Sequence, residues 1–205
     1  MNRENNLDLL RIISCIFVVI IHVSGIWIEH ANIQNYSFFV SVNTLAKFAV
    51  PVFFMLSGHF NIENAKNENL HYFYNKTIRK ILIPTFIFTL FYIFVKIVES
   101  LLTKNYKTLF YDIVTGNIGA LWFLYALIPI YFLVPLIIKT KNRIGENKFV
   151  LFSSLYFIFS ILFALSSKYY TSFNLGNAIN YLGFFLIGYC ITRVKLKSMI
   201  SKIFV

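Results

Sequence analysis

Six long apolar segments constrain this chain more than any other feature of its sequence. They cover about residues 9–28, 38–60, 81–98, 118–138, 149–167 and 177–192. Each is close to the ~20 residues that an α-helix needs to cross a bilayer. The chain is also 58% hydrophobic and 13% charged, whereas soluble domains are typically ~45–50% apolar and ~25% charged. We therefore predict an all-α fold, a polytopic bundle of about six transmembrane helices, forming a single domain over residues 1–205.

The basic residues between these segments are distributed unequally. Fourteen lysines and arginines lie at the N-terminus, on alternate connections and after residue 192, whereas only three lie on the other connections. Because cytoplasmic loops of membrane proteins are rich in lysine and arginine, both ends of the chain are predicted to be cytoplasmic. An even number of spans agrees with six. The net charge of +11 therefore reflects membrane orientation and does not indicate nucleic-acid binding.

Polar side chains inside the apolar segments are the candidates for function, because charge in a membrane helix normally faces a protein interior or a water-filled cavity. Arg11 and His22 lie 11 residues apart on the first segment, which places them on one helix face, ~16 Å apart along the axis. In the second segment, Lys47 lies ten residues before Ser57. If Ser57 marks the inner end of that helix, Lys47 and His22 lie at similar depth.

A neutral imidazole at the position of His22 would be a suitable general base. The alternative for His22 is an ordinary hydrogen bond between helices. The alternative for Lys47 is a side chain that extends to the outer membrane interface.

A basic group stands at the cytoplasmic start of the third segment. Lys76 and Arg79 share a face if the helix begins early enough, and Lys80 follows them. Arginine and lysine together can bind a phosphate. The alternative is ordinary charge that only orients the helix.

Aromatic residues begin the fourth segment near the predicted outer interface. Trp122 and Tyr125 would form the aromatic belt found in many membrane proteins, or a platform on which a sugar ring stacks. No hydrolase, zinc-protease, nucleotide-triphosphatase or dinucleotide motif is present, and no spacing of ligands suggests a metal or redox cofactor.

Five strings, in this order, resemble the acyltransferase-3 family of bacterial membrane enzymes, in particular the branch related to intercellular adhesin and enterobacterial common antigen O-acetyltransferases. They are LDLLRIISCIFVVIIHVSG, KFAVPVFFMLSGHF, NKTIRKILIP, GALWFLYALIPIYFLVPLI and YLGFFLIGYCI. The first string holds the family's arginine and histidine, here Arg11 and His22. In the third, Lys76 replaces the more usual arginine and Arg79 matches the second basic position.

This resemblance implies an acyltransferase that transfers groups other than amino-acyl groups. It would move an acetyl or similar acyl group from cytoplasmic acyl-CoA, a cosubstrate, to a hydroxyl of a cell-envelope polysaccharide or lipid-linked sugar, in a bacterial cytoplasmic membrane. Catalysis is expected from His22 and Arg11, and acyl-CoA binding from Lys76, Arg79 and Lys80. The residues expected to stabilise an oxyanion or line the site are Lys47, Ser57, Trp122 and Tyr125. His22 would deprotonate the acceptor hydroxyl, or it or a relay group would first carry the acyl group.

Two other functions are compatible with the sequence. A polysaccharide export subunit could use His22 and Lys47 to line a pathway and would need no acyl donor. Members of the acyltransferase-3 family are usually longer than this chain and have more membrane helices. We therefore expect the 205 residues to be the N-terminal part of a longer family domain, and an inactive truncated product is the remaining alternative.

Overall fold

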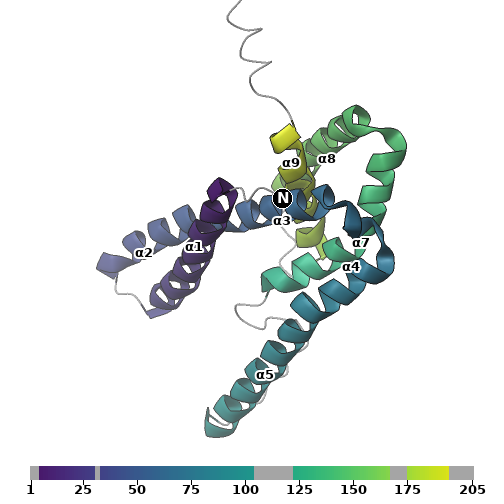
Figure 1. The fold of residues 1–205 in the computed structure, drawn as a ribbon. Coiled ribbons are helices and arrows are strands. Elements are labelled where there is room, and N and C mark those ends of the chain that lie inside the picture. The colour runs from purple at the N-terminus through teal and green to yellow at the C-terminus, as the bar shows by residue number, and fades with distance from the viewer. Residues whose placement is uncertain (1–4, 31–32, 104–121, 167–174, 194–205) are drawn as a thin grey trace, which may run out of the picture. The chain divides into compact units, whose positions relative to one another are not determined.

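The computed structural model describes residues 5–30, 33–103, 122–166 and 175–193, and all regular elements in these ranges are helical (Figure 1). The absence of strands among these residues confirms the all-α prediction. In chain order the elements are α1 (Asn5–His30), α2 (Ile33–Ala46), α3 (Ala49–Glu63), the 3₁₀ turn η1 (Ala65–Glu68), α4 (Leu70–Thr77), the π-helical turn η2 (Ile78–Leu82), α5 (Ile83–Thr103), α7 (Trp122–Ile144), α8 (Glu146–Ser166) and α9 (Leu175–Arg193).

Five helical stretches of the described chain are long and apolar enough to cross a membrane. They are Asn6–Ile28, Asn35–Glu63, Leu70–Leu102, Phe123–Ile144 and Glu146–Leu165, and a shorter apolar helix covers Ala178–Ile191. These stretches correspond to the six predicted segments, which confirms a polytopic helical bundle. The predicted start of the fourth segment, residues 118–121, lies outside the described ranges. The orientation in the membrane and the single domain stay predictions.

The second predicted segment is two helices rather than one. It breaks between α2 and α3, at Lys47 and Phe48, because Pro51 has no N–H and its ring crowds the carbonyl four residues earlier. That carbonyl belongs to Lys47 and instead accepts the Val50 N–H at 3.3 Å. The expectation that this helix ends at Ser57 is also wrong, since α3 continues to Glu63.

The third predicted segment begins about ten residues earlier than expected. The side chain of Asn69 accepts the Tyr72 N–H at 3.0 Å and so caps the first turn of α4. The helix then widens into η2, where the Ile83 N–H bonds the Ile78 carbonyl. Pro84 follows, and it can neither donate to the Lys80 carbonyl nor fit closely against it. A wider turn relieves that crowding, and such π turns are frequent at functional sites.

The basic connection predicted between the fourth and fifth segments is almost entirely helical. α7 continues to Ile144 and α8 starts at Glu146, so Gly145 alone separates them. Gly145 has a φ of 84°, a left-handed conformation that glycine adopts without the steric cost of a Cβ. Lys141 and Arg143 therefore lie on the last turn of α7.

The chain divides into two compact units. Unit 1 contains Met1–Glu63 and Phe184–Val205, and unit 2 contains Asn64–Gly183, so the division falls within α9. In unit 1, α1 packs against both α2 and α3. α3 also meets the second half of α9 backbone to backbone, because a Cβ added to Gly58 would overlap the Phe185 carbonyl. Small residues at such crossings permit close helix packing in membranes.

Unit 2 is organised around α7, which contacts η1, α4, η2 and α8. The Tyr74 hydroxyl donates to the Phe132 carbonyl at 3.0 Å and joins α4 to α7. Within the same unit, the first half of α9 contacts α8, where the Tyr156 hydroxyl donates to the Ile179 carbonyl at 3.2 Å. The rod formed by α4, η2 and α5 is thus anchored at its α4 end.

Candidate functional site

A basic pocket lies on the α4–η2 part of unit 2. It has a volume of about 490 Å³, within the range of small-molecule sites. Its lining residues all come from one continuous stretch of chain: Asn69, His71, Tyr72, Asn75, Lys76, Arg79 and Lys80. The structure therefore brings together the three basic residues that the sequence predicted to bind an acyl donor.

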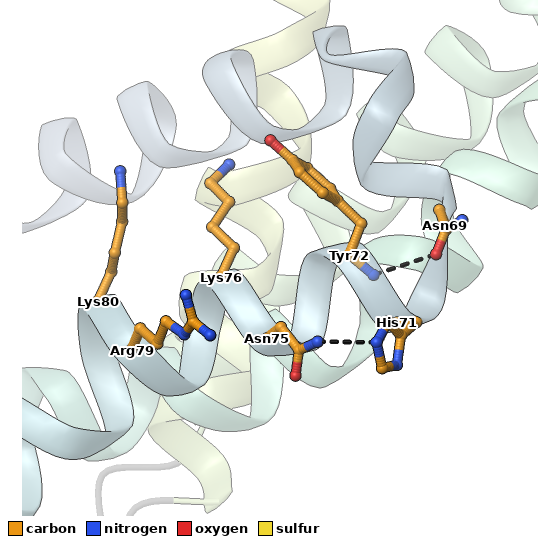
Figure 2. Close-up of a pocket in the computed structure, with 7 residues that line it drawn as sticks. All are labelled: Asn69, His71, Tyr72, Asn75, Lys76, Arg79 and Lys80. Carbon is orange, nitrogen blue, oxygen red and sulfur yellow. Dashed lines mark hydrogen bonds between the residues drawn. The ribbon is translucent and has the colours of Figure 1, made fainter.

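The side chains of this basic pocket form two neighbouring rows (Figure 2). In the first row, Tyr72, Lys76 and Lys80 extend the same way. The second row contains Arg79 and an Asn75 amide that bonds the His71 ring at 3.0 Å. We expected Lys76 to share a helix face with Arg79, but it extends beside Lys80. Lys76 and Lys80 are four residues apart, a spacing that places two side chains on the same helix face.

Positive charge in the basic pocket is not balanced by acid. None of its lining residues is a carboxylate. Lys76 is half-buried, donates to the Asn67 side chain at 3.2 Å and lies 5.8 Å from the centre of the Phe73 ring. Arg79 and Lys80 are exposed and make no ion pair with any residue in the described ranges. This arrangement is suited to an anion with more than one phosphate.

In unit 1, the surroundings of His22 are set by an amide on the neighbouring helix. Asn43 of α2 donates to the Ile21 carbonyl and to the Ser24 hydroxyl of α1, both at 2.9 Å. His22 itself is half-buried and makes no hydrogen bond or ion pair with the part of the chain that the structure describes. Sequence analysis missed Asn43, although a lone amide in an apolar run is a recognisable signal.

Lys47 lies close to the level of His22. After Lys47 in the sequence, Phe48 packs against Phe17 of α1 with ring centres 4.8 Å apart. Before Lys47, Asn43 contacts α1 at the level of His22. Lys47 lies between these two contacts, within about one helical turn of His22 along α1. Its side chain is exposed at the break between α2 and α3. Broken helices in membrane proteins often accompany binding sites.

Arg11 and Ser57 are the other two predicted site residues in unit 1. Arg11 is 44% exposed, lies 3.5 Å from the Asp8 carboxylate and stacks 4.5 Å from the centre of the Phe60 ring. Ser57 is half-buried within α3, and its carbonyl accepts the Asn61 amide at 2.9 Å. Neither residue has a described contact with His22.

Sequence analysis also missed an ion cluster at the end of α3. Glu63 lies 3.2 Å from His59 and accepts from Arg193 of α9 at 2.7 Å. The Arg193 guanidinium also lies 5.5 Å from the Tyr189 ring. We call these three residues, His59, Glu63 and Arg193, the α3–α9 ion cluster. Nothing in the spacing of residues 130 positions apart indicates that they meet.

The aromatic residues of the fourth segment begin α7. The Tyr125 hydroxyl lies 2.6 Å from the Thr89 hydroxyl of α5, so this tyrosine faces another helix within unit 2. Trp122 is the first residue of α7, and its side chain lies outside the described parts of the chain. Within those parts, no three side chains of histidine, cysteine, aspartate or glutamate gather closely enough to hold a metal ion.

Comparison with known proteins gives one match. The family model described as an acyltransferase domain, that of the acyltransferase-3 family, matches residues 4–203. Searches of curated proteins and of solved structures found no match. The family match covers both units and all the candidate residues described above.

Proposed function

Because the chain belongs to the acyltransferase-3 family, we propose that it is a membrane enzyme that transfers an acetyl or similar acyl group from cytoplasmic acyl-CoA. The acceptor is a hydroxyl of a cell-envelope polysaccharide or lipid-linked sugar, and the enzyme resides in the bacterial cytoplasmic membrane. The observation that carries this proposal is the basic pocket, in which Lys76, Arg79 and Lys80 gather without a carboxylate.

The donor binds through its phosphates in the basic pocket. Arg79 offers a planar fork of N–H donors that suits a phosphate, and the two lysines act as mobile point charges. Their mutual repulsion is relieved when an anion enters. An exporter has no need for such a group of unpaired cations, so the pocket favours the acyltransferase over the export alternative.

His22 is the general base of this proposal. It accepts the proton of the acceptor hydroxyl while the hydroxyl oxygen attacks the thioester carbonyl. The new C–O ester bond forms as the C–S bond breaks, and the CoA thiolate leaves and is protonated. Support comes from a His22 ring without a described partner and from Lys47 near the same level. Lys47 stabilises the developing oxyanion, and Ser57, Trp122 and Tyr125 line the site.

The test is transfer of radiolabelled acetyl from acetyl-CoA to envelope glycan in membranes that carry the chain. His22→Ala should lower transfer by about 10²–10⁴-fold at equal protein abundance and unchanged donor affinity. Lys47→Met should lower it to a smaller extent. Label that does not depend on His22 contradicts its role as base, undiminished turnover in Lys47→Met contradicts the oxyanion role, and bound donor without any transfer contradicts the proposed activity.

A further inference from the structure

Polar side chains follow one side of α5, although this helix is apolar enough to cross a membrane. Thr85, Thr89, Tyr92 and Lys96 fall within an arc of about 60° when each residue turns by ~100°. We call these four residues the polar stripe. They are buried or half-buried, whereas residues elsewhere around the helix, such as Phe91 at 63%, are exposed. The polar stripe therefore faces the protein, and the apolar side faces lipid.

The first two residues of the polar stripe form a short hydrogen-bond chain with α7. The Thr89 hydroxyl donates to the Thr85 carbonyl at 2.7 Å and lies 2.6 Å from the Tyr125 hydroxyl. A hydroxyl has a single proton. Because Thr89 gives its proton to the carbonyl, Tyr125 must be the donor to Thr89. The phenol oxygen of Tyr125 is then left with lone pairs that can accept a hydrogen bond.

The Thr85 hydroxyl, in contrast to that of Tyr125, has a proton that it can donate. Thr85 is only 4% exposed, and its Oγ1 has no hydrogen-bond partner within the described ranges. A buried donor without a partner destabilises the protein, and such groups in native proteins usually have an explanation, for example a ligand. Thr85 thus offers an O–H donor and Tyr125 offers an acceptor oxygen, a combination that suits the C=O and N–H of a secondary amide.

The position of this pair is set by the length of the rod. The 21 residues of α5 span ~31 Å, about the thickness of the hydrocarbon core, so α4 and η2 project beyond it. Thr85 follows Lys80 by five residues, or ~7 Å along the axis. If α5 is the part that crosses the bilayer, we expect the basic pocket at the membrane border and the polar stripe to begin where the rod enters the membrane.

We propose that Thr85 and Tyr125 bind an amide group of the pantetheine arm of acyl-CoA, while the phosphates of the same molecule occupy the basic pocket. This inference rests on the proposed function. The ligand it describes has an anionic end and a long arm with amides. An anionic phospholipid has the charged end but no such arm, so only acyl-CoA would form amide hydrogen bonds with the polar stripe.

The test compares two ligands on the purified full chain in detergent. Acetyl-CoA carries the arm, and 3′-phospho-ADP carries the same phosphates without it. Thr85→Val and Tyr125→Phe should each weaken acetyl-CoA binding by about two- to tenfold, the loss of one hydrogen bond, and should leave 3′-phospho-ADP binding unchanged. Thr85→Ser, which keeps the hydroxyl, should bind acetyl-CoA as the wild type does. Thr44→Val and Tyr36→Phe, exposed on α2, are the matched controls and should change nothing.

The outcomes separate this inference from the proposed function. If the wild type binds neither ligand, the proposed function fails and the inference fails with it. If both ligands bind but Thr85→Val and Tyr125→Phe affect neither, or weaken both equally, the inference alone is overturned. Loss of acetyl-CoA binding in Thr85→Ser would also overturn it, because the hydroxyl would then not be the group that matters. Competition of 3′-phospho-ADP by anionic phospholipid vesicles, without competition by acetyl-CoA, would assign the basic pocket to lipid and overturn the inference.

Discussion

Charges in the two units are arranged in opposite ways. In unit 1, the α3–α9 ion cluster joins Glu63 to His59 and Arg193, so positive and negative groups meet. In the basic pocket of unit 2, Arg79 and Lys80 stand beside other cations and no carboxylate. The first arrangement is balanced by described residues of the protein, whereas no carboxylate lines the second.

This difference teaches how to separate charges that hold helices together from charges that bind a ligand. A cation paired with a carboxylate gains little from a further anion, and an exposed pair contributes only ~0–1 kcal/mol to stability. Neighbouring cations repel one another, so they lower the stability of the free protein and raise its affinity for phosphate. Three substitutions test whether unit 2 binds the donor through its cations while the close contacts of unit 1 serve stability.

The largest effect is expected for Arg79→Ala in unit 2. A hydrogen bond to a charged group contributes about 1.5–3 kcal/mol, so acetyl-CoA should bind about 10- to 100-fold more weakly, as measured by titration of the purified chain. Affinity of the wild type should also fall more steeply with salt than that of the variant. Arg143→Ala, on the last turn of α7 and outside the pocket, is the control and should retain wild-type affinity. Equal losses in both variants would contradict a specific pocket.

A smaller effect is expected for Gly58→Ala in unit 1. The added Cβ would overlap the Phe185 carbonyl, and backbone must move to make room, which typically costs about 1–3 kcal/mol. Thermal unfolding in detergent should show a melting temperature lowered by roughly 2–10 °C. The control is Gly25→Ala on α1, where an added Cβ meets nothing within 4 Å; this variant should unfold at or slightly above the wild-type temperature. An unchanged melting temperature for Gly58→Ala would show that α3 and α9 do not meet closely.

The smallest effect is expected for Glu63→Gln. The two ends of its pair with Arg193 are 43% and 41% exposed, so the loss should be about 0.2–1 kcal/mol, or a melting temperature lowered by ~1–4 °C. Donor affinity should not change. Lys148→Gln on α8 removes an exposed charge that has no described partner, and its melting temperature should stay at the wild-type value. Weakened acetyl-CoA binding in Glu63→Gln would break the division between the two units.

Much of the fold follows from the sequence because membrane spans are determined by length and hydropathy. What the apolar pattern could not reveal are interruptions caused by single residues. Pro51 lies four residues after Lys47, where it interrupts the helix. Gly145 is the single residue between two helices where a longer connection was predicted. Each of these effects depends on local backbone geometry, which a hydropathy profile averages away.

The site shows the same limit. The grouping of Lys76, Arg79 and Lys80 was predictable because they are close in sequence. The level of Lys47 relative to His22 was expected from a helix that ends at Ser57, but that helix breaks at Lys47 and continues to Glu63. The i and i+4 spacing of Lys76 and Lys80 also predicts that they share a helix face, as Figure 2 shows, whereas Arg79 lies in the second row. The roles of His22 and of the basic residues stay predictions.

The wide turn η2 also affects how this site can change. Pro84 fixes where the turn occurs, and it therefore also sets how α4 is rotated about the helix axis relative to α5. A single-residue insertion or deletion between Lys80 and Thr85 would rotate the cations by about 100° relative to the polar stripe, without moving any helix out of the membrane. A change in length of this rod would therefore alter how the cations and the polar stripe are aligned, while every side chain of both groups stays the same.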